Sequence, residues 1–131
     1  MINGKPLILA VDDEEPIRNL ITYTFEPHNL EVVTAENGKS AITILEHNPV
    51  DVIITDLLMP SMTGLALIRE MKKRKSSIPI IIITAYGNTE MVKEIIAEGV
   101  FRLIEKPLDF DVLVPIVQEA IEYKKNNDNK S

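Results

Sequence analysis

Short apolar runs that alternate with segments of helical spacing constrain the fold of this chain more than any other feature. In the segments between the runs, apolar residues recur three and four positions apart, as they do along one face of an amphipathic helix. A strand-helix order repeated five times with short connections predicts a parallel sheet covered by helices on both faces, which is a doubly wound α/β domain. The five runs lie at residues 6–11, 30–35, 51–55, 78–84 and 101–105.

The third and fourth runs are apolar at nearly every position, which predicts central strands buried on both faces. Proline and glycine agree with the helix boundaries, since Pro16 fits a first helical turn and Gly64 marks the approach to a helix. We predict one domain over residues 1–125 and a polar disordered tail, or the start of a linker, over 126–131. The residues with helical spacing are Ile17, Leu20, Ile21 and Thr24; Ala41, Ile42 and Leu45; Leu65, Leu67, Ile68 and Met71; Met91, Val92, Ile95 and Ile96; and the segment 112–121.

Composition excludes several classes of function. The 131 residues suffice for one domain with a buried core, and 45% hydrophobic with 26% charged residues is typical of a globular protein. A formal net charge of −6 opposes binding to phosphate backbones, so we expect this chain alone to bind no nucleic acid. The absence of cysteine excludes disulfides and suits a reducing cytoplasm, and no apolar run is long enough to span a membrane. The basic stretch "KKRK" at 72–75 is interpreted as a solvated helix end.

Polar residues stand where the predicted strands end. Asp12 and Asp13 follow the first run and Asp56 follows the third, while Thr84 closes the fourth and Lys106 follows the fifth. In doubly wound sheets, ligands bind beyond the carboxyl ends of the strands. Each of these residues alone is common in loops, helix starts or strands, but together they fall at the exits of four different strands. The sequence therefore predicts a functional site at this edge of the sheet.

Three carboxylates at one edge would repel one another unless a cation lay among them. Oxygen ligands without cysteine or a nearby histidine suit Mg²⁺, which binds one or two carboxylates together with waters and a phosphate oxygen. Asp56 would then attack a phosphoryl group and form an aspartyl phosphate. Lys106 would bind a phosphoryl oxygen by charge and Thr84 by a hydrogen bond.

Four segments of the chain resemble the receiver domain of two-component response regulators, the chemotaxis-regulator-like fold: "ILAVDDEEPIR", "DVIITDLLMPSMTG", "IPIIIITAYG" and "EKPLD". The resemblance covers residues 6 to about 123. It implies a flavodoxin-like strand order of 2-1-3-4-5 and a cis peptide bond between Lys106 and Pro107. The donor it implies is a sensor histidine kinase or a histidine phosphotransfer protein.

The resemblance also implies the role of each site residue. Asp56 would be the phosphoacceptor, Thr84 and Lys106 would contact the phosphoryl group, and the module would catalyse only its own phosphorylation and dephosphorylation. Mg²⁺ would be held by Asp12, Asp13, Asp56 and the backbone carbonyl of Leu58.

One departure concerns the conformational switch of such domains, which often carry a tyrosine or phenylalanine three residues before the lysine. Here that position is Leu103, which we interpret as a residue that packs in the sheet. Whether a movement of Thr84 is coupled to an aromatic side chain, as in such domains, is therefore an open question. Phe101 lies two residues earlier and is expected on the same strand face as Leu103. Tyr86 and Leu58 are candidates for shielding an acyl phosphate from water.

Docking of a donor is expected at an apolar rim formed by Pro16, Ile17, Leu20 and Pro107. Ile17 and Leu20 also fit the core stripe of their helix, and we favour the core for these two. An output domain or a second copy of the chain is a further possible partner.

Two other functions remain open. The chain is consistent with the excised receiver of a longer DNA-binding transcriptional activator instead of a stand-alone phosphorelay protein. A remote alternative is a phosphohydrolase of the haloacid-dehalogenase type, which also forms an aspartyl phosphate at a strand end. Such enzymes use a second aspartate two residues after the nucleophile, where this chain has Leu58.

Overall fold

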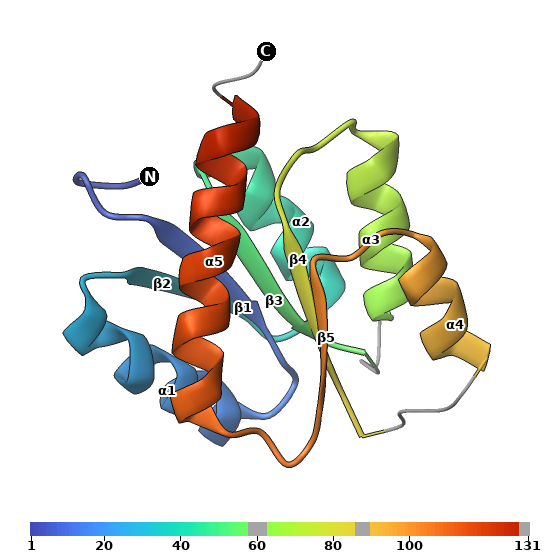
Figure 1. Ribbon diagram of the computed structural model, residues 1–131, viewed down its shortest axis with the longest axis horizontal. Helices are drawn as coiled ribbons and strands as arrows, with labels where there is room; N and C mark the ends of the chain where they lie inside the picture. Colours follow the sequence, from blue (N-terminus) through green and yellow to red (C-terminus); the bar gives the residue numbers. More distant parts are fainter. Residues whose placement is uncertain (58–62, 86–89, 129–131) are drawn as a thin grey trace.

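A parallel five-stranded sheet forms the centre of the protein in the computed structural model, which describes residues 1–57, 63–85 and 90–128 (Figure 1). Its strand order is β2-β1-β3-β4-β5, so the predicted order 2-1-3-4-5 is confirmed. The chain crosses over the sheet with a helix after each strand, as parallel pairing requires. The strands are β1 (Leu7–Val11), β2 (Glu31–Ala35), β3 (Val52–Asp56), β4 (Ile80–Thr84) and β5 (Arg102–Glu105).

Helices cover both faces of the sheet, as predicted. In Figure 1, α1 and α5 lie in front of the sheet and α2 and α3 behind it, while α4 lies beside α3. The last helix extends to Asp128, three residues into the segment expected to be a tail. None of the helices in the described ranges has the length and apolar character needed to cross a membrane. The helices are α1 (Glu15–Phe25), a short 3₁₀ helix η1 (Glu26–His28), α2 (Gly38–His47), α3 (Gly64–Lys73), α4 (Glu90–Ala97) and α5 (Phe110–Asp128).

The central strands are buried on both faces because each supplies side chains to two cores. In β1, Leu7 and Leu9 pack with α2, α3 and α4, whereas Ile8 and Ala10 pack with α1 and α5. β4 is buried along its whole length in the same way, while the edge strands β2 and β5 carry exposed residues. The rigid centre of the sheet therefore fixes where its strands end.

Two residues assigned to helical core stripes lie elsewhere. Leu20 is 46% exposed, so the expectation of a core position is wrong for it, whereas Ile17 is half-buried against the core between α1 and α5. The buried stripe of α1 follows steps of four residues through Ile17, Ile21 and Phe25, and Leu20 lies to one side of it. Ile96 of α4 is also exposed, because the buried stripe of that helix runs through Val92 and Ile95 and leaves Ile96 to one side.

The expectation that Phe101 and Leu103 share a strand face is also wrong. Phe101 precedes β5 and packs toward α5, where its ring lies 5.3 Å from that of Tyr123. Leu103 packs on the opposite face, in the core with α3 and α4. Strand alternation does not extend to a residue outside the strand, so Phe101 does not take the place of an aromatic residue at position 103.

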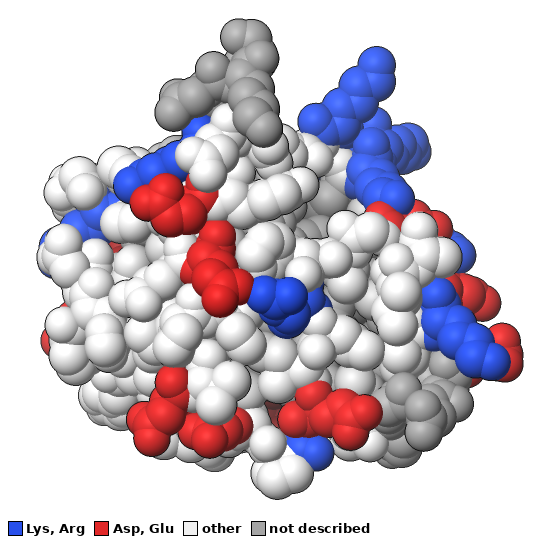
Figure 2. Space-filling model, viewed as in Figure 1, with Lys and Arg blue, Asp and Glu red and all other residues white. Residues whose placement is uncertain are grey.

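The basic stretch at 72–75 does end a helix, and Figure 2 shows blue residues gathered over that end of α3. Lys72 forms an ion pair with Glu98, and Arg74 bridges to Glu46 on α2 as well as to Glu70. These pairs lie at the surface, with Glu70 and Glu98 half-buried, so each contributes little to stability. The interpretation as a solvated helix end is confirmed.

Candidate functional site

Three aspartates converge at the carboxyl edge of the sheet. β1 pairs with β3 in a register that places Val11 beside Thr55, so Asp12 and Asp56 leave neighbouring strands at the same level. Asp13 follows directly, and carboxylate oxygens of the three residues all lie within 4.8 Å of one another. The strands end at the lower edge of Figure 1, where Figure 2 shows acidic residues in red. The structure thus brings together the three carboxylates that the strand exits predict.

Lys106 and Thr84 reach the same place from β5 and β4. The Lys106 ammonium lies 3.3 Å from Oδ2 of Asp56, and its backbone N–H donates a 2.7 Å hydrogen bond to the carbonyl of Thr84. Thr84 is buried, with 1% of its surface exposed. The peptide bond between Lys106 and Pro107 is cis, as the resemblance implies.

The backbone and one carboxylate oxygen of Asp12 are held by hydrogen bonds. Its N–H donates to the carbonyl of Ala35, and its Oδ1 accepts from the N–H of Glu14 at 2.9 Å. Its carbonyl accepts a 2.8 Å hydrogen bond from Nη1 of Arg18. The sequence gives no sign of this last contact, because an arginine in the first turns of a helix is usually solvated.

Burial and like charge act together on Asp12. Asp12 is 2% exposed, and desolvation together with the neighbouring Asp56 and Asp13 raises its pKa, against the hydrogen bond from Glu14 and the charge of Lys106. Burial disfavours the charged form of Lys106, but Asp56, Asp12 and Glu14 outweigh it and raise the pKa of that ammonium. One lysine among three carboxylates leaves the cluster with an excess of negative charge.

The donor set fits a divalent cation such as Mg²⁺. Oxygens of Asp12, Asp13 and Asp56 are close enough to share one ion, and Asp13 is exposed, so solvent can complete its coordination. The cluster contains no nitrogen or sulfur ligand, which is the pattern of a hard cation. Leu58, whose carbonyl is a further expected ligand, lies outside the described residues.

α3 begins against the segment that follows Asp56. The N–H of Gly64 donates a 2.7 Å hydrogen bond to the carbonyl of Leu57. A Cβ at position 64 would lie 3.0 Å from the carbonyl oxygen of Asp56 and 3.1 Å from the Cα of Leu57. These distances are tighter than most Cβ contacts, so a side chain here would push two backbone segments apart by a few tenths of an ångström, and glycine lets α3 begin close to the end of β3.

The residues predicted for the conformational switch and for docking lie partly in the core and partly at the surface. Leu103 packs into the core, so its interpretation as sheet packing is consistent with its contacts. At the site edge, Pro16 and Pro107 are exposed, as is Leu20 on α1. Tyr86 lies outside the described residues.

We expect Asp12→Asn to raise the free energy of unfolding of the metal-free protein by about 1 kcal/mol at neutral pH, because it removes a repelled charge. The pKa of Asp12 is higher in the folded protein than in the unfolded chain, so the ionised carboxyl lowers stability at neutral pH. This loss of stability disappears as the pH falls through the raised pKa of Asp12. The stability gained by Asp12→Asn should therefore shrink on acidification. Urea unfolding in EDTA at several pH values measures the gain at neutral pH and its decrease on acidification. Asp111→Asn, in exposed α5 sequence, is the control, and an equal gain there would assign the effect to net charge alone.

A cavity of about 490 Å³ lies at the opposite edge of the sheet. Met71, Pro79, Val100 and Tyr123 are among its lining residues, and it borders the starts of β4 and β5. The ion pair between Lys72 and Glu98 is at its rim. The carboxylate cluster is therefore not part of this cavity.

Comparisons of the sequence and of the structure with known proteins point to the same family. Residues 8–118 match the model of the response regulator receiver domain. The chain is 35% identical over 115 residues to the regulatory protein AtoC of Escherichia coli K12, a match that covers 88% of this chain and 25% of AtoC. It is 32% identical over 117 residues to the DNA-binding transcriptional regulator NtrC of Salmonella typhimurium, covering 89% of this chain and 25% of NtrC.

A solved receiver domain protein from Clostridium thermocellum shares the fold with a TM-score of 0.84 and 33% identity, over 92% of this chain and 97% of that one. The chain spans about a quarter of the length of the two curated regulators. The family match favours a signalling module and gives no support to a phosphohydrolase of the haloacid-dehalogenase type. Because the family model matches most of the chain and the sheet has the strand order of that fold, the protein belongs to the response regulator receiver domain family.

Proposed function

We propose that Asp56 is the phosphoacceptor of this receiver domain and that the donor is a sensor histidine kinase or a histidine phosphotransfer protein. The observation that carries the proposal is the cluster of three carboxylates with the Lys106 ammonium 3.3 Å from Asp56. No other group of three potential metal-binding side chains is found in the described ranges 1–57, 63–85 and 90–128. Asp56 is the member of the cluster that a buried central strand delivers directly.

In the proposed reaction, a carboxylate oxygen of Asp56 forms a bond to phosphorus while the bond from phosphorus to the donor breaks and the donor leaves with that electron pair. Lys106 transfers its hydrogen bond from the carboxylate to a phosphoryl oxygen, and the Thr84 hydroxyl binds another. Asp12, Asp13 and Asp56 would hold Mg²⁺, which when bound supplies positive charge that stabilises the transition state. All these groups belong to the receiver, so it would catalyse its own phosphorylation and dephosphorylation.

The positions of Thr84 and Lys106 support a conformational response. Thr84 ends β4 just before the segment that leads to α4, and Lys106 follows β5. A phosphoryl group that draws both residues toward Asp56 would shift the populations of arrangements of α4 and β5. Unchanged amide chemical shifts over 90–105 after phosphorylation would contradict this response.

A docking surface for the donor is supported by the exposure of Pro16, Leu20 and Pro107 beside the carboxylates. Ile17 is half-buried against the core and would contribute less. Unimpaired phosphoryl transfer from a cognate donor to a Leu20→Ala variant would count against this surface.

The proposed function is tested by incubating the protein with acetyl phosphate, a small phosphodonor, and measuring its intact mass. We expect a gain of one phosphoryl group with Mg²⁺ and loss of that gain when EDTA removes the metal. An NMR titration with Mg²⁺ in parallel should shift amides beside Asp12 and Asp56. A protein that binds Mg²⁺ without gaining mass would point to fast hydrolysis or to a strict need for a protein donor, whereas the absence of both the adduct and Mg²⁺ binding would overturn the proposal.

The relatives favour a second, compatible proposal about the output. AtoC is named a regulatory protein and NtrC a DNA-binding transcriptional regulator, and this chain matches a quarter of each. The chain would then act as the receiver of a longer DNA-binding regulator. The length of the natural reading frame distinguishes this from a stand-alone phosphorelay protein, and DNA binding by residues 1–131 alone is not expected, given their net charge of −6.

A further inference from the structure

The turn between β1 and α1 is held together by an arginine side chain. α1 begins at Glu15, and its N-cap residue Glu14 forms no side-chain capping bond. The Arg18 guanidinium reaches back from the helix and donates its 2.8 Å hydrogen bond to the carbonyl of Asp12. The backbone N–H of Arg18 also donates to the carbonyl of Glu14. Arg18 therefore connects the body of the helix to the residue that leaves the strand.

The same turn fixes the orientation of the Asp12 carboxylate. Oδ1 of Asp12 accepts from the N–H of Glu14, whose carbonyl in turn accepts from Arg18. The three residues form a closed set of hydrogen bonds in which one carboxylate oxygen of Asp12 is engaged. Within the described residues, Oδ2 of Asp12 accepts no hydrogen bond, which leaves it available for a cation.

Mutual repulsion acts against this arrangement. Asp12, Asp13 and Asp56 bring their oxygens within 4.8 Å, and Asp12 and Asp13 lie on the turn itself. Without a restraint, the turn would relax away from Asp56 in the metal-free protein. Arg18 is half-buried, and its hydrogen bond to a backbone carbonyl resists that movement without occupying a carboxylate oxygen.

We propose that Arg18 is a positioning residue for Mg²⁺ binding: it holds the β1–α1 turn so that Asp12 and Asp13 remain directed at Asp56. This inference rests on the proposed function, because it assumes that the three carboxylates bind Mg²⁺. Residues that orient metal ligands from behind typically change metal affinity by about 10–100-fold when removed.

The test measures the dissociation constant of Mg²⁺ by calorimetry for wild type, Arg18→Ala and Arg18→Lys. We expect Arg18→Ala to weaken binding by about tenfold. Arg18→Lys, which keeps a cationic donor able to reach a carbonyl, should recover part of the loss. The rate of phosphorylation by acetyl phosphate at saturating Mg²⁺ should change little, because Arg18 contacts none of the reacting groups. The amide signal of Glu14 should shift in metal-free Arg18→Ala, since its hydrogen bond to Asp12 loosens.

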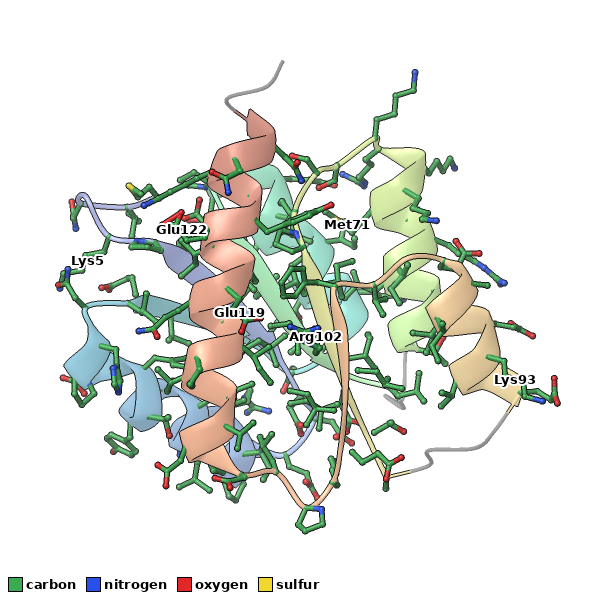
Figure 3. All side chains as sticks on the ribbon, in the orientation of Figure 1. Lys5, Met71, Lys93, Arg102, Glu119 and Glu122 are labelled. Carbon is green, nitrogen blue, oxygen red and sulfur yellow. The ribbon has the colours of Figure 1, made fainter. Side chains whose placement is uncertain are left out.

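The matched control is Arg102→Ala. Figure 3 shows Arg102 on β5 and Glu119 on α5 lying close together, and they form an exposed ion pair at 2.6 Å. This variant removes the same side chain and the same charge away from the turn. Removal of a positive charge would by itself strengthen Mg²⁺ binding. An equal loss of Mg²⁺ affinity in Arg102→Ala would therefore assign the effect to a general disturbance of the fold and overturn the inference, as would unchanged affinity in Arg18→Ala. Far-ultraviolet circular dichroism checks that the variants fold.

The outcomes separate this inference from the proposed function. A wild-type protein that binds Mg²⁺ and accepts phosphate, with Arg18→Ala unaffected in affinity, overturns the role of Arg18 alone. A wild-type protein that binds no Mg²⁺ overturns both.

Discussion

Replacement of Asp56 by asparagine is expected to abolish the phosphoryl adduct formed from acetyl phosphate and Mg²⁺. The amide lacks the charge and the nucleophilic oxygen that the reaction needs, and it leaves Lys106 without the ion partner 3.3 Å away. Asparagine has nearly the same shape as aspartate, so the sheet edge should remain folded. Intact mass spectrometry should show no adduct in Asp56→Asn under conditions in which wild type is labelled.

The control for this variant is Asp111→Asn, which changes an aspartate in the first turn of α5. It should be labelled as fully as wild type. An adduct that persists in Asp56→Asn would mean that another side chain accepts the phosphoryl group, and peptide mapping would then identify it. We expect the loss of essentially all labelling, because Asp56 is the single nucleophile of the proposed reaction.

Gly64→Val is expected to lower the free energy of unfolding by about 1–3 kcal/mol, the usual cost of adding atoms where none fit. The added Cβ would lie 3.0 Å from the carbonyl oxygen of Asp56 and 3.1 Å from Leu57 Cα, both of which are backbone atoms. Backbone cannot rotate aside as a flexible side chain does, so either α3 or the end of β3 must shift. Urea unfolding measures the loss, and phosphorylation by acetyl phosphate should slow because Asp56 is displaced.

Ala66→Val is the matched control, since Ala66 is exposed in the first turn of the same helix. It imposes the helix cost of a β-branched residue without the contact to Asp56. If Gly64→Val proves too unstable to purify, Gly64→Ala carries the same Cβ contact in a milder form. Equal stability of Gly64→Ala and wild type, with equal phosphorylation, would show that the close approach does not constrain the site.

The sequence suffices to predict most of the site because parallel strands end at one edge. Asp12, Asp56 and Lys106 each directly follow one of the apolar runs, and their closeness in space follows from the register of the sheet. The family resemblance adds the chemistry that these residues are expected to perform. Neither source depends on details of side-chain packing.

Other features depend on how a helix or strand is rotated about its axis and on which side chains touch. The spacing of apolar residues specifies neither. A spacing of three and four identifies a stripe on α1 but does not decide whether Leu20 lies inside it or at its margin. Phe101 faces away from Leu103 because β5 starts one residue later than the apolar run. The carbonyl contact of Arg18 joins residues six positions apart through a turn whose shape is known only from the structure.

The position of the carboxylate site at the strand ends affects how such domains can diverge in evolution. Asp12, Asp13 and Asp56 lie at the ends of central strands that are buried between two cores, whereas the outward face of α1 exposes Leu20 and Tyr23 to solvent. If the donor docks on that face, as proposed, substitutions there would change which surfaces the domain recognises without moving the carboxylates. Duplicated copies of this protein could therefore acquire separate partners, and so avoid cross-talk between signalling pathways, while the proposed phosphorylation site stays the same.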